Sequence, residues 1–225
     1  QKCFDCGQRF HGAVQAALGW ACWKTYLGRP VTDVYRADAV EILAEALRSW
    51  QPEEALAMLE ANLALRRRYW SHDEDAILSC LTLVANCQTD LNRIDQALDL
   101  EREIYAKRVA LFGAEAEDAL IDAGNLSISL ILLERYGEAL QFLREIHPVA
   151  ERALGREHSL PLDIGHNLAV ALFEHAEASP DDRLEAVSLM QHVLKRRRRV
   201  LGPEHPRTQK SEADLLRMRK RLPPA

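Results

Sequence analysis

The sequence predicts an all-α protein whose helices stack as a repetitive solenoid, and three observations lead to this fold class. Ala, Leu, Glu and Arg dominate the composition, and no glycine occurs between Gly28 and Gly113, which favours helices over strands. A Glu/Gln-Ala-Leu/Val signature recurs at spacings of 42, 42 and 47 residues, with its common alanine at Ala55, Ala97, Ala139 and Ala186. A glycine near the end of the second, third and fourth units recurs at spacings of 42 and 47 residues, at Gly113, Gly155 and Gly202. Two landmarks that share one step and one interruption indicate an internal repeat.

Within a unit the apolar residues have helical spacing. In the third unit, Leu126, Leu130 and Leu133 form one stripe of a first helix. Leu140 and Leu143 belong to the matching stripe of a second helix, since residues three and four apart share a helix face. Each unit is therefore predicted to be a pair of helices joined by a short turn.

The helix boundaries follow from caps and breakers. Gly155 is expected to take the left-handed position after a helix, where a missing Cβ removes the steric penalty. Pro206 suits the first turn of the next helix, because the N–H that proline lacks has no partner there. The predicted pairs cover 34–70, 74–112, 117–154 and 159–201, and a closing helix covers about 205–221. The closing helix, with Leu215 and Leu216 beside basic residues, is predicted to be a terminal cap with one solvent-exposed face.

The repeat resembles the tetratricopeptide repeats (TPRs) of the kinesin-light-chain type. The resemblance covers about residues 34–210 and rests on four stretches: Gly124-Asn-Leu-Ser127, His166-Asn-Leu-Ala169, Tyr136-Gly-Glu-Ala-Leu140 and Leu201-Gly-Pro-Glu-His-Pro-Arg-Thr208. Units one and two depart from the pattern, because Glu41 and Leu83 stand in the place of the Asn. The resemblance implies a right-handed superhelical solenoid of about four TPR-like helix pairs, in which the first helices line a concave face.

The resemblance also implies a binding site on the concave face. Asn125 and Asn167 would offer a donor and an acceptor to the backbone of an extended peptide. Ser129 and Ala171 lie four residues further along the same stripes. The alternative is that each Asn caps or braces a neighbouring repeat. The resemblance thus implies a non-catalytic protein–protein interaction module whose ligand is a peptide or a partner helix.

The first 33 residues differ from the repeats and are treated as a separate cysteine-bearing segment. Cys3 and Cys6 form one Cys-x-x-Cys pair, and His11 with Cys22 would complete the four ligands that zinc requires. Because the sequence begins at Gln1, it is expected to be a fragment. A second possibility is therefore that further ligands precede it in a larger zinc module of the MYND or RING type.

The alternative for this segment is a capping helix without metal. A helix over residues 11–27 would place Val14, Ala17, Leu18 and Ala21 on one face, and that face is predicted to pack on the first repeat. Metal analysis of the purified protein separates the two interpretations. A stoichiometric amount of zinc supports the zinc module, and its absence leaves the capping helix.

Charge and composition bear on the remaining classes of function. The chain has 29 basic and 34 acidic residues, a net charge of −5, whereas a nucleic-acid-binding domain is expected to be strongly basic. No stretch reaches the roughly 18 apolar residues of a membrane-spanning helix. The five cysteines are an odd number at irregular spacing, which favours reduced thiols and a cytoplasmic protein.

No catalytic residues and no small-molecule substrate are expected, because the sequence contains no phosphate loop, nucleophile elbow or metalloprotease motif. The remaining alternative is that the chain is the helical accessory domain of a larger enzyme. The basic runs at 66–68 and 195–199 are predicted to be solvent-exposed helix ends. His72-Asp-Glu-Asp75 is predicted to cap a helix rather than to bind metal. Cys80 and Cys87 are expected to be buried on one helix face.

Overall fold

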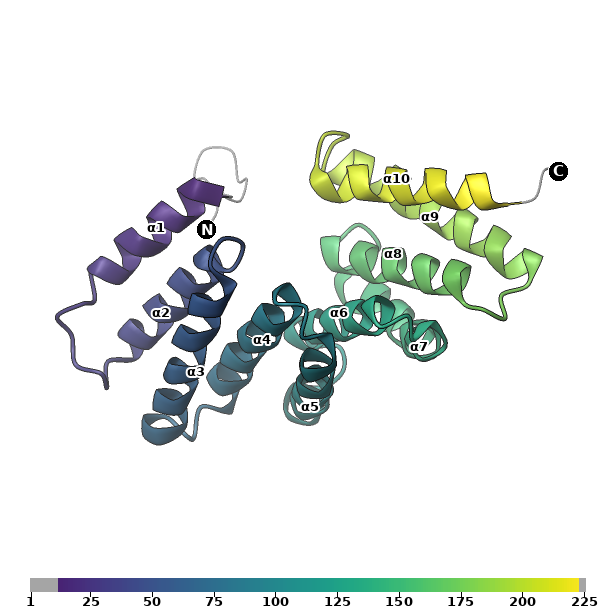
Figure 1. Cartoon of the computed structure of the whole chain (residues 1–225). Coiled ribbons are helices and arrows are strands. Elements are labelled where there is room, and N and C mark those ends of the chain that lie inside the picture. Colours follow the sequence, from purple (N-terminus) through teal and green to yellow (C-terminus); the bar gives the residue numbers. More distant parts are fainter. Residues whose placement is uncertain (1–11, 223–225) are drawn as a thin grey trace. The chain divides into compact units, whose positions relative to one another are not determined.

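The computed structural model describes residues 12–222, and within that range it consists of ten α-helices and no strands (Figure 1). The helices are α1 (Gly12–Lys24), α2 (Val34–Leu47), α3 (Pro52–Tyr69), α4 (Glu74–Asp90), α5 (Ile94–Phe112), α6 (Glu117–Leu132), α7 (Tyr136–Leu154), α8 (Ser159–Glu174), α9 (Pro180–Val200) and α10 (Pro206–Arg221). The chain divides into two compact units at Ile104 and Tyr105, so the boundary falls within α5.

The four predicted helix pairs and the closing helix are confirmed. The first helices of the pairs are α2, α4, α6 and α8, the second helices are α3, α5, α7 and α9, and α10 is the closing helix. Among residues 12–222 no helix is both long and apolar enough to cross a membrane.

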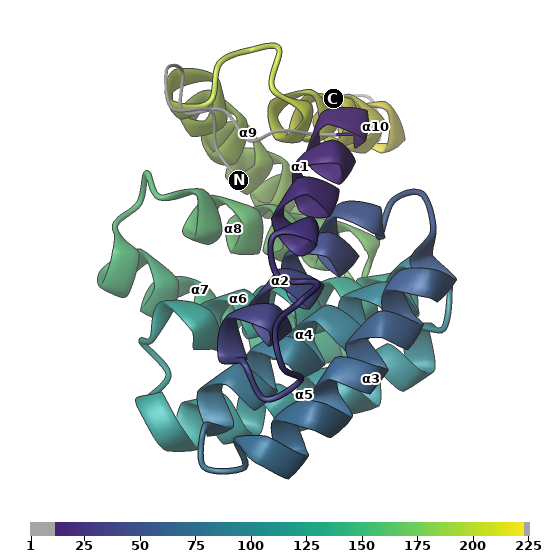
Figure 2. The same ribbon diagram turned by 90° about the vertical axis from the view of Figure 1, so that its left-hand side faces the viewer.

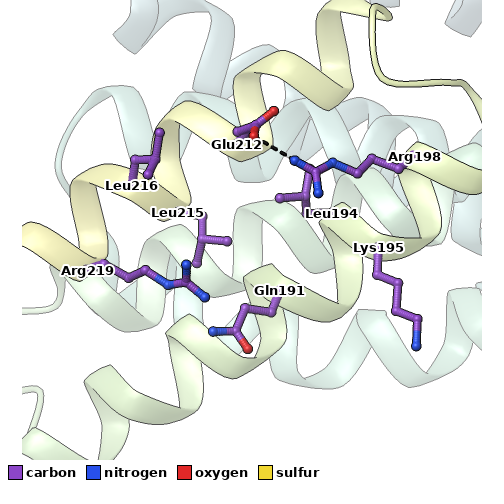
Figure 3. A pocket seen from close by; sticks show the side chains of 8 residues that line it. All are labelled: Gln191, Leu194, Lys195, Arg198, Glu212, Leu215, Leu216 and Arg219. Carbon is purple, nitrogen blue, oxygen red and sulfur yellow. Dashed lines mark hydrogen bonds and ion pairs between the residues drawn. The ribbon is translucent and has the colours of Figure 1, made fainter.

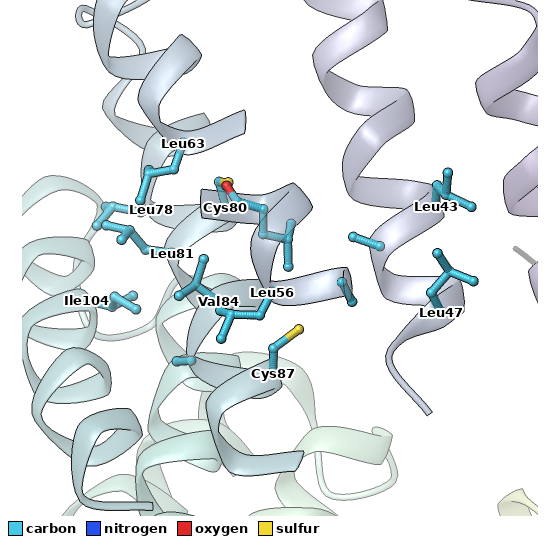
Figure 4. Packing of buried hydrophobic residues seen from close by; sticks show 14 residues of the cluster. Leu43, Leu47, Leu56, Leu63, Leu78, Cys80, Leu81, Val84, Cys87 and Ile104 are labelled. Atoms are coloured by element: carbon cyan, nitrogen blue, oxygen red, sulfur yellow. The ribbon is translucent and has the colours of Figure 1, made fainter. Parts of the chain in front are cut away.

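The core of unit 1 lies between α2, α3 and α4, to which α5 contributes Ile104 (Figure 4). Leu43, Leu59 and Cys80 have no exposed surface. Cys87 is also fully buried, which confirms the prediction for the two thiols. Burial raises the pKa of Cys80 to about 12 and that of Cys87 to about 11, so both remain neutral thiols that pack as small apolar groups.

Helix α1 packs against α2, as Figures 1 and 2 show. The residue at the closest approach is Gly19, because a Cβ built there would lie 2.9 Å from the Cβ of Ala46. The prediction that Val14, Ala17 and Ala21 pack on the first repeat is therefore wrong, because these three residues are exposed. The backbones of α1 and α2 approach each other at Gly19, which has no side chain. With this contact, Trp23 rather than Val14 packs against the core.

Unit 2 is built by stacking α7 on α8, α8 on α9 and α9 on α10, while the first helices α6 and α8 also lie side by side (Figure 1). The shared alanine of the repeat lies in the first two turns of each second helix. Ala55, Ala97, Ala139 and Ala186 all have no exposed surface. A larger side chain at this position would separate the helices, because protein interiors are close-packed.

The corners between repeats use the predicted caps. Gly155 has φ +84° and ends α7, and Gly113 and Gly202 likewise have positive φ, +85° and +87°. The linker histidine then begins the next helix. The Nδ1 of His158 accepts from the backbone N–H of Leu160 at 3.4 Å. In the same way, the Oδ1 of Asp73 accepts from the N–H of Ala76 at 3.1 Å, which confirms that the acidic linker caps α4.

The basic runs are not wholly exposed, and the prediction for them is wrong at one position in each. Arg66 is 2% exposed and contacts Glu41 at 2.6 Å and Asp38 at 2.7 Å, both on α2. Arg197 is 3% exposed, and its guanidinium lies 2.6 Å from Asp163 of α8. A buried guanidinium satisfies its N–H donors by pairing with carboxylates inside the stack. A solvent-exposed cation at a helix end would not need carboxylate partners.

A third arginine occupies the same repeat position in α5. Arg108 is 1% exposed and its Nε lies 2.7 Å from the carboxylate of Asp122, which is 3% exposed. This buried ion pair joins the second helix of one pair to the first helix of the next.

Removing one partner of the buried pair should destabilise the protein strongly. Asp122→Ala removes a carboxylate from the buried guanidinium of Arg108, and we expect a loss of up to about 3–5 kcal/mol in the free energy of unfolding. Glu115→Ala removes the partner of an exposed arginine, Arg152, at 2.8 Å, and should cost at most about 1 kcal/mol. Urea denaturation of both variants measures the difference. Equal losses would show that Arg108 does not depend on its carboxylate.

Two glycine substitutions should shift stability in opposite directions. A Cβ would meet no atom within 4 Å at Gly155 or at Gly124, so the effects come from the backbone alone. Gly155→Ala forces a side chain into the left-handed region and should cost about 1–2 kcal/mol. Gly124→Ala, inside α6, should add up to about 1 kcal/mol. Thermal denaturation tests both. A stabilising Gly155→Ala would exclude the left-handed cap as the reason for this glycine.

Candidate peptide-binding surface

In unit 2, the first helices α6 and α8 and the closing helix α10 present a face made of equivalent repeat positions. We call it the first-helix surface and define it by equivalent positions in the repeat. It comprises Ile121, Asn125, Ile128 and Leu132 of α6; Asp163, Asn167, Val170 and Glu174 of α8; and Lys210, Asp214, Arg217 and Arg221 of α10. The spacing of three and four residues places each set on one side of its helix.

The part of this surface on α6 is apolar and accessible. Ile121, Ile128 and Leu132 are 37%, 43% and 53% exposed, and Asn125 between them is partly exposed. The opposite stripe of the same helix holds Leu126, which is 5% exposed. Helix α6 is thus apolar on two sides, and only one of them is covered within unit 2.

The part on α8 is more covered, because α10 packs beside it. Asn167 and Val170 are each 9% exposed. Glu174 is held by Arg221, whose Nη1 lies 2.6 Å from one carboxylate oxygen and 2.8 Å from the other. Arg217 lies 3.7 Å from the same carboxylate. The first-helix surface therefore changes from apolar on α6 to ion-paired between α8 and α10.

The structure places the two predicted asparagines differently. The side-chain amide of Asn125 makes no hydrogen bond with any described residue. Asn167 donates from Nδ2 to the Oγ of Ser127 at 2.9 Å and so links α8 to α6. That is the contact expected of an asparagine that braces a neighbouring repeat. It uses one N–H and leaves the carbonyl oxygen of Asn167 without another partner among residues 12–222.

The other two predicted site residues lie behind this surface. Ser129 and Ala171 have no exposed surface, so in this arrangement their side chains contact only other parts of the protein. The Oγ of Ser129 has no hydrogen-bond partner within the described range. Ile121, Ile128 and Leu132 were missed from the sequence, although their spacing was visible, because the Leu126 stripe already supplied α6 with an apolar face for the core.

The predicted zinc ligands are mostly outside the part of the chain that the structure describes. Cys3, Cys6 and His11 lie outside the described residues. Cys22 is described, and it is a partly buried free thiol. Among residues 12–222, no three His, Cys, Asp or Glu side chains are grouped so as to hold a metal ion. The zinc site stays a prediction.

A buried polar chain joins α8, α9 and α10 behind the first-helix surface. The Nε2 of His166 lies 3.2 Å from Asp214 and its Nδ1 lies 3.1 Å from the Oγ of Ser211. Ser211 also accepts from Arg197 at 2.6 Å. A hydroxyl that accepts from the guanidinium donates to Nδ1, which assigns the His166 proton to Nε2. Serine, histidine and aspartate thus contact one another in the order of a hydrolase triad.

Burial gives this chain of contacts a structural role. Ser211 has no exposed surface and His166 is 4% exposed, so the hydroxyl is not accessible to a substrate in this geometry. Burial lowers the pKa of His166, against the opposing effect of the hydrogen bond that the ring donates to Asp214, and the charge of Arg197 lowers the pKa further. Burial raises the pKa of Asp214, but the hydrogen bond that His166 donates and the charges of Arg217 and Lys210 outweigh it, and the net shift is downward. The ring is neutral and the carboxylate is ionised.

Stability should therefore fall in mild acid. Because the folded-state pKa of His166 is lowered, its contribution is present above about pH 6.5 and is lost as the pH falls through the folded pKa. His166→Gln should reduce the slope of stability against pH in this range by up to about 1.4 kcal/mol per pH unit. His192→Gln, at an exposed position of α9, is the control. Denaturation in urea at several pH values measures the slopes, and identical slopes for His166→Gln and the wild type would contradict the assignment.

The comparisons with known proteins agree with the repeat. The tetratricopeptide repeat family model matches residues 123–160 and 181–207, all within unit 2. A search of curated proteins finds no significant match.

Solved structures extend the likeness in fold to most of the chain. A putative kinesin light chain of Podosopora anserina with nearly identical TPR-like repeats matches with a TM-score of 0.67 and 21% identity, over 85% of this chain and 88% of that one. A variant of that protein gives 0.68 and 22%, over 82% and 85%. BtubC (BKLC) of P. vanneervenii gives 0.64 and 14%, over 92% and 90%. Residues 123–160 and 181–207 thus match the tetratricopeptide repeat, and the chain as a whole is similar in fold to kinesin light chain-like repeat proteins.

Proposed function

We propose that this chain is a non-catalytic scaffold for protein–protein interactions, which binds a peptide or a partner helix on the concave face of its TPR array. The first-helix surface is the part of that face in unit 2. One observation carries the proposal: α6 exposes a row of large apolar side chains on both sides of an asparagine without a partner among the described residues.

The apolar row supports a ligand because it is a contiguous patch on one helix. Ile121, Ile128 and Leu132 stand on one stripe and are all more than a third exposed. Single exposed apolar residues are ordinary on protein surfaces, whereas grouped ones are typical of interaction sites. Side chains of a bound segment that covered this row would gain the free energy of apolar burial.

Asn125 supports a ligand that presents backbone groups. Its amide has both a donor and an acceptor, and its neighbours on the stripe offer only apolar surface. An extended peptide can pair its own N–H and C=O with such an amide, while its side chains cover Ile121 and Ile128. Asn167 would add its carbonyl oxygen from α8. Ser129 and Ala171 would support the two helices from behind.

The free thiols of Cys22, Cys80 and Cys87 fit a reducing compartment, and we place the scaffold in the cytoplasm. Among the charged groups of the first-helix surface, Arg217 and Arg221 are already engaged by Glu174. Shape and apolar contact, rather than charge alone, are therefore expected to dominate recognition.

Substitutions on α6 should weaken binding without unfolding the protein. Peptides selected from a displayed random-sequence library against the full chain provide the ligands. Ile128→Asp should weaken their binding at least about tenfold, because a charge would be buried under the ligand. Asn125→Ala should weaken it about fivefold, the equivalent of about one hydrogen bond. Isothermal titration calorimetry measures both.

Leu184→Asp is the matched control, because Leu184 is 55% exposed on α9, away from this surface. It should leave the affinity unchanged, and all three variants should keep the circular dichroism spectrum of the wild type. Selected peptides that bind Ile128→Asp and Asn125→Ala as tightly as the wild type would overturn the assignment of the site.

A further inference from the structure

A second surface lies on the other side of the closing helix. An open groove of about 450 Å³ runs between α9 and α10 (Figure 3). Leu215 points from α10 into the space between the helices, and Arg198 reaches across to Glu212 at 2.6 Å. The groove is also lined by Lys195 of α9 and by Leu216 and Arg219 of α10.

The repeat register shows what shape of ligand fits this groove. Counting 47 residues back, Glu212, Leu216 and Arg219 correspond to Gly165, Ala169 and Leu172 of α8. Those three residues are buried, and a Cβ at Gly165 would lie 2.9 Å from His147 of α7 and 3.3 Å from Val193 of α9. At Gly165 this face of α8 is therefore enclosed between α7 and the following second helix, α9. On α10 the same face borders the groove, so the groove has the geometry that receives an α-helix.

The α9 side of the groove agrees with this comparison. Arg198 corresponds to Glu151 of α7, and Glu151 lies 3.3 Å from Arg196 of α9. In the preceding repeat, the residue equivalent to Arg198 therefore contacts α9, the helix that packs against α8.

The chemistry of the lining indicates the sequence of such a helix. Three cations, Lys195, Arg198 and Arg219, stand against one carboxylate, Glu212. Leu216 adds an apolar side chain that is 52% exposed. A helix with an apolar stripe for Leu216 and acidic residues beside the stripe would complement both features.

The same lining indicates that the helix comes from another molecule. The positions that hold Gly, Ala and Leu in α8 hold Glu, Leu and Arg in α10. A permanent helix pair buries small and apolar residues at its contact, whereas reversible interfaces keep charged groups at their edges. We propose that the α9/α10 groove docks an acidic amphipathic α-helix of a separate partner protein.

This surface is distinct from the first-helix surface. On α10, Asp214, Arg217 and Arg221 lie on the side opposite to Glu212, Leu216 and Arg219, since successive residues turn by about 100°. The two sites can therefore be tested separately on the full chain.

The test uses a fluorescent synthetic helix of about 20 residues, with leucines at spacings of three and four and glutamates elsewhere, as the probe. Its binding to the full chain is followed by fluorescence anisotropy at low ionic strength. Arg219→Glu should weaken binding about three- to fivefold, as expected for one charge contact at a solvent-exposed site. Leu216→Asp should weaken it about tenfold, because it removes the apolar contact and adds repulsion.

Two matched variants provide the controls. Lys220→Glu makes the same charge change one residue further along α10, outside the groove, and should change the affinity less than twofold. Leu184→Asp replaces a leucine of similar exposure, 55%, at a position outside the groove lining, and should have no effect. Ile128→Asp, which alters the first-helix surface, should also leave the binding of this probe unchanged.

Three results would each overturn the proposal. The first is equal weakening by Arg219→Glu and Lys220→Glu, which would show attraction to net charge only. The second is equal affinity for a peptide of the same composition in scrambled order, which would show that no amphipathic helix is recognised. The third is no detectable binding of the probe to the wild-type chain. None of them bears on the peptide site of α6.

Discussion

The structure depends on the close contact that each second helix makes at the alanine of the repeat signature. Ala55, Ala97, Ala139 and Ala186 have no exposed surface, and a larger side chain there would separate the helices and leave voids in the core. Once the two helices of a pair are packed together, part of their apolar surface is still open, and in unit 2 the next helix covers it, as the packing of α8 on α6 and α7 shows. The stacking of unit 2 and the register of its corners follow from that requirement.

Buried charge gives the stacks their specific register. Arg66, Arg108 and Arg197 stand at related positions near the ends of second helices, and each is at most 3% exposed. Each reaches a carboxylate on a first helix, within the pair or in the next one. A displaced register would leave a guanidinium buried without its partner, which costs far more than the loss of an exposed ion pair. We therefore regard these contacts as register markers that the apolar residues alone do not supply.

The same stacking leaves two faces uncovered, and they differ chemically. The first-helix surface on α6 is apolar around Asn125, whereas the α9/α10 groove is cationic around Leu216. The difference has a simple origin in the repeat. Helix α6 has large exposed apolar residues, such as Ile128. Helix α10 has Glu212 and Arg219 at the positions where α8 has the buried residues Gly165 and Leu172. One scaffold can thus offer separate contacts to an extended peptide and to an acidic helix.

The sequence by itself determined the fold class, the four helix pairs, the closing helix and the corners, because period, apolar spacing, glycine and proline act locally along the chain. It also indicated Asn125 and Asn167 by resemblance. Only the tertiary structure decided which side of each helix is covered. It buried one arginine of each basic run, hid Ser129 and Ala171, turned Gly19 rather than Val14 towards α2, and exposed Ile128 on α6. The physical reason is that the side a helix buries depends on where its neighbours approach most closely. That approach is set by residues on other helices, which lie 14 and 40 positions away in two of the contacts described above.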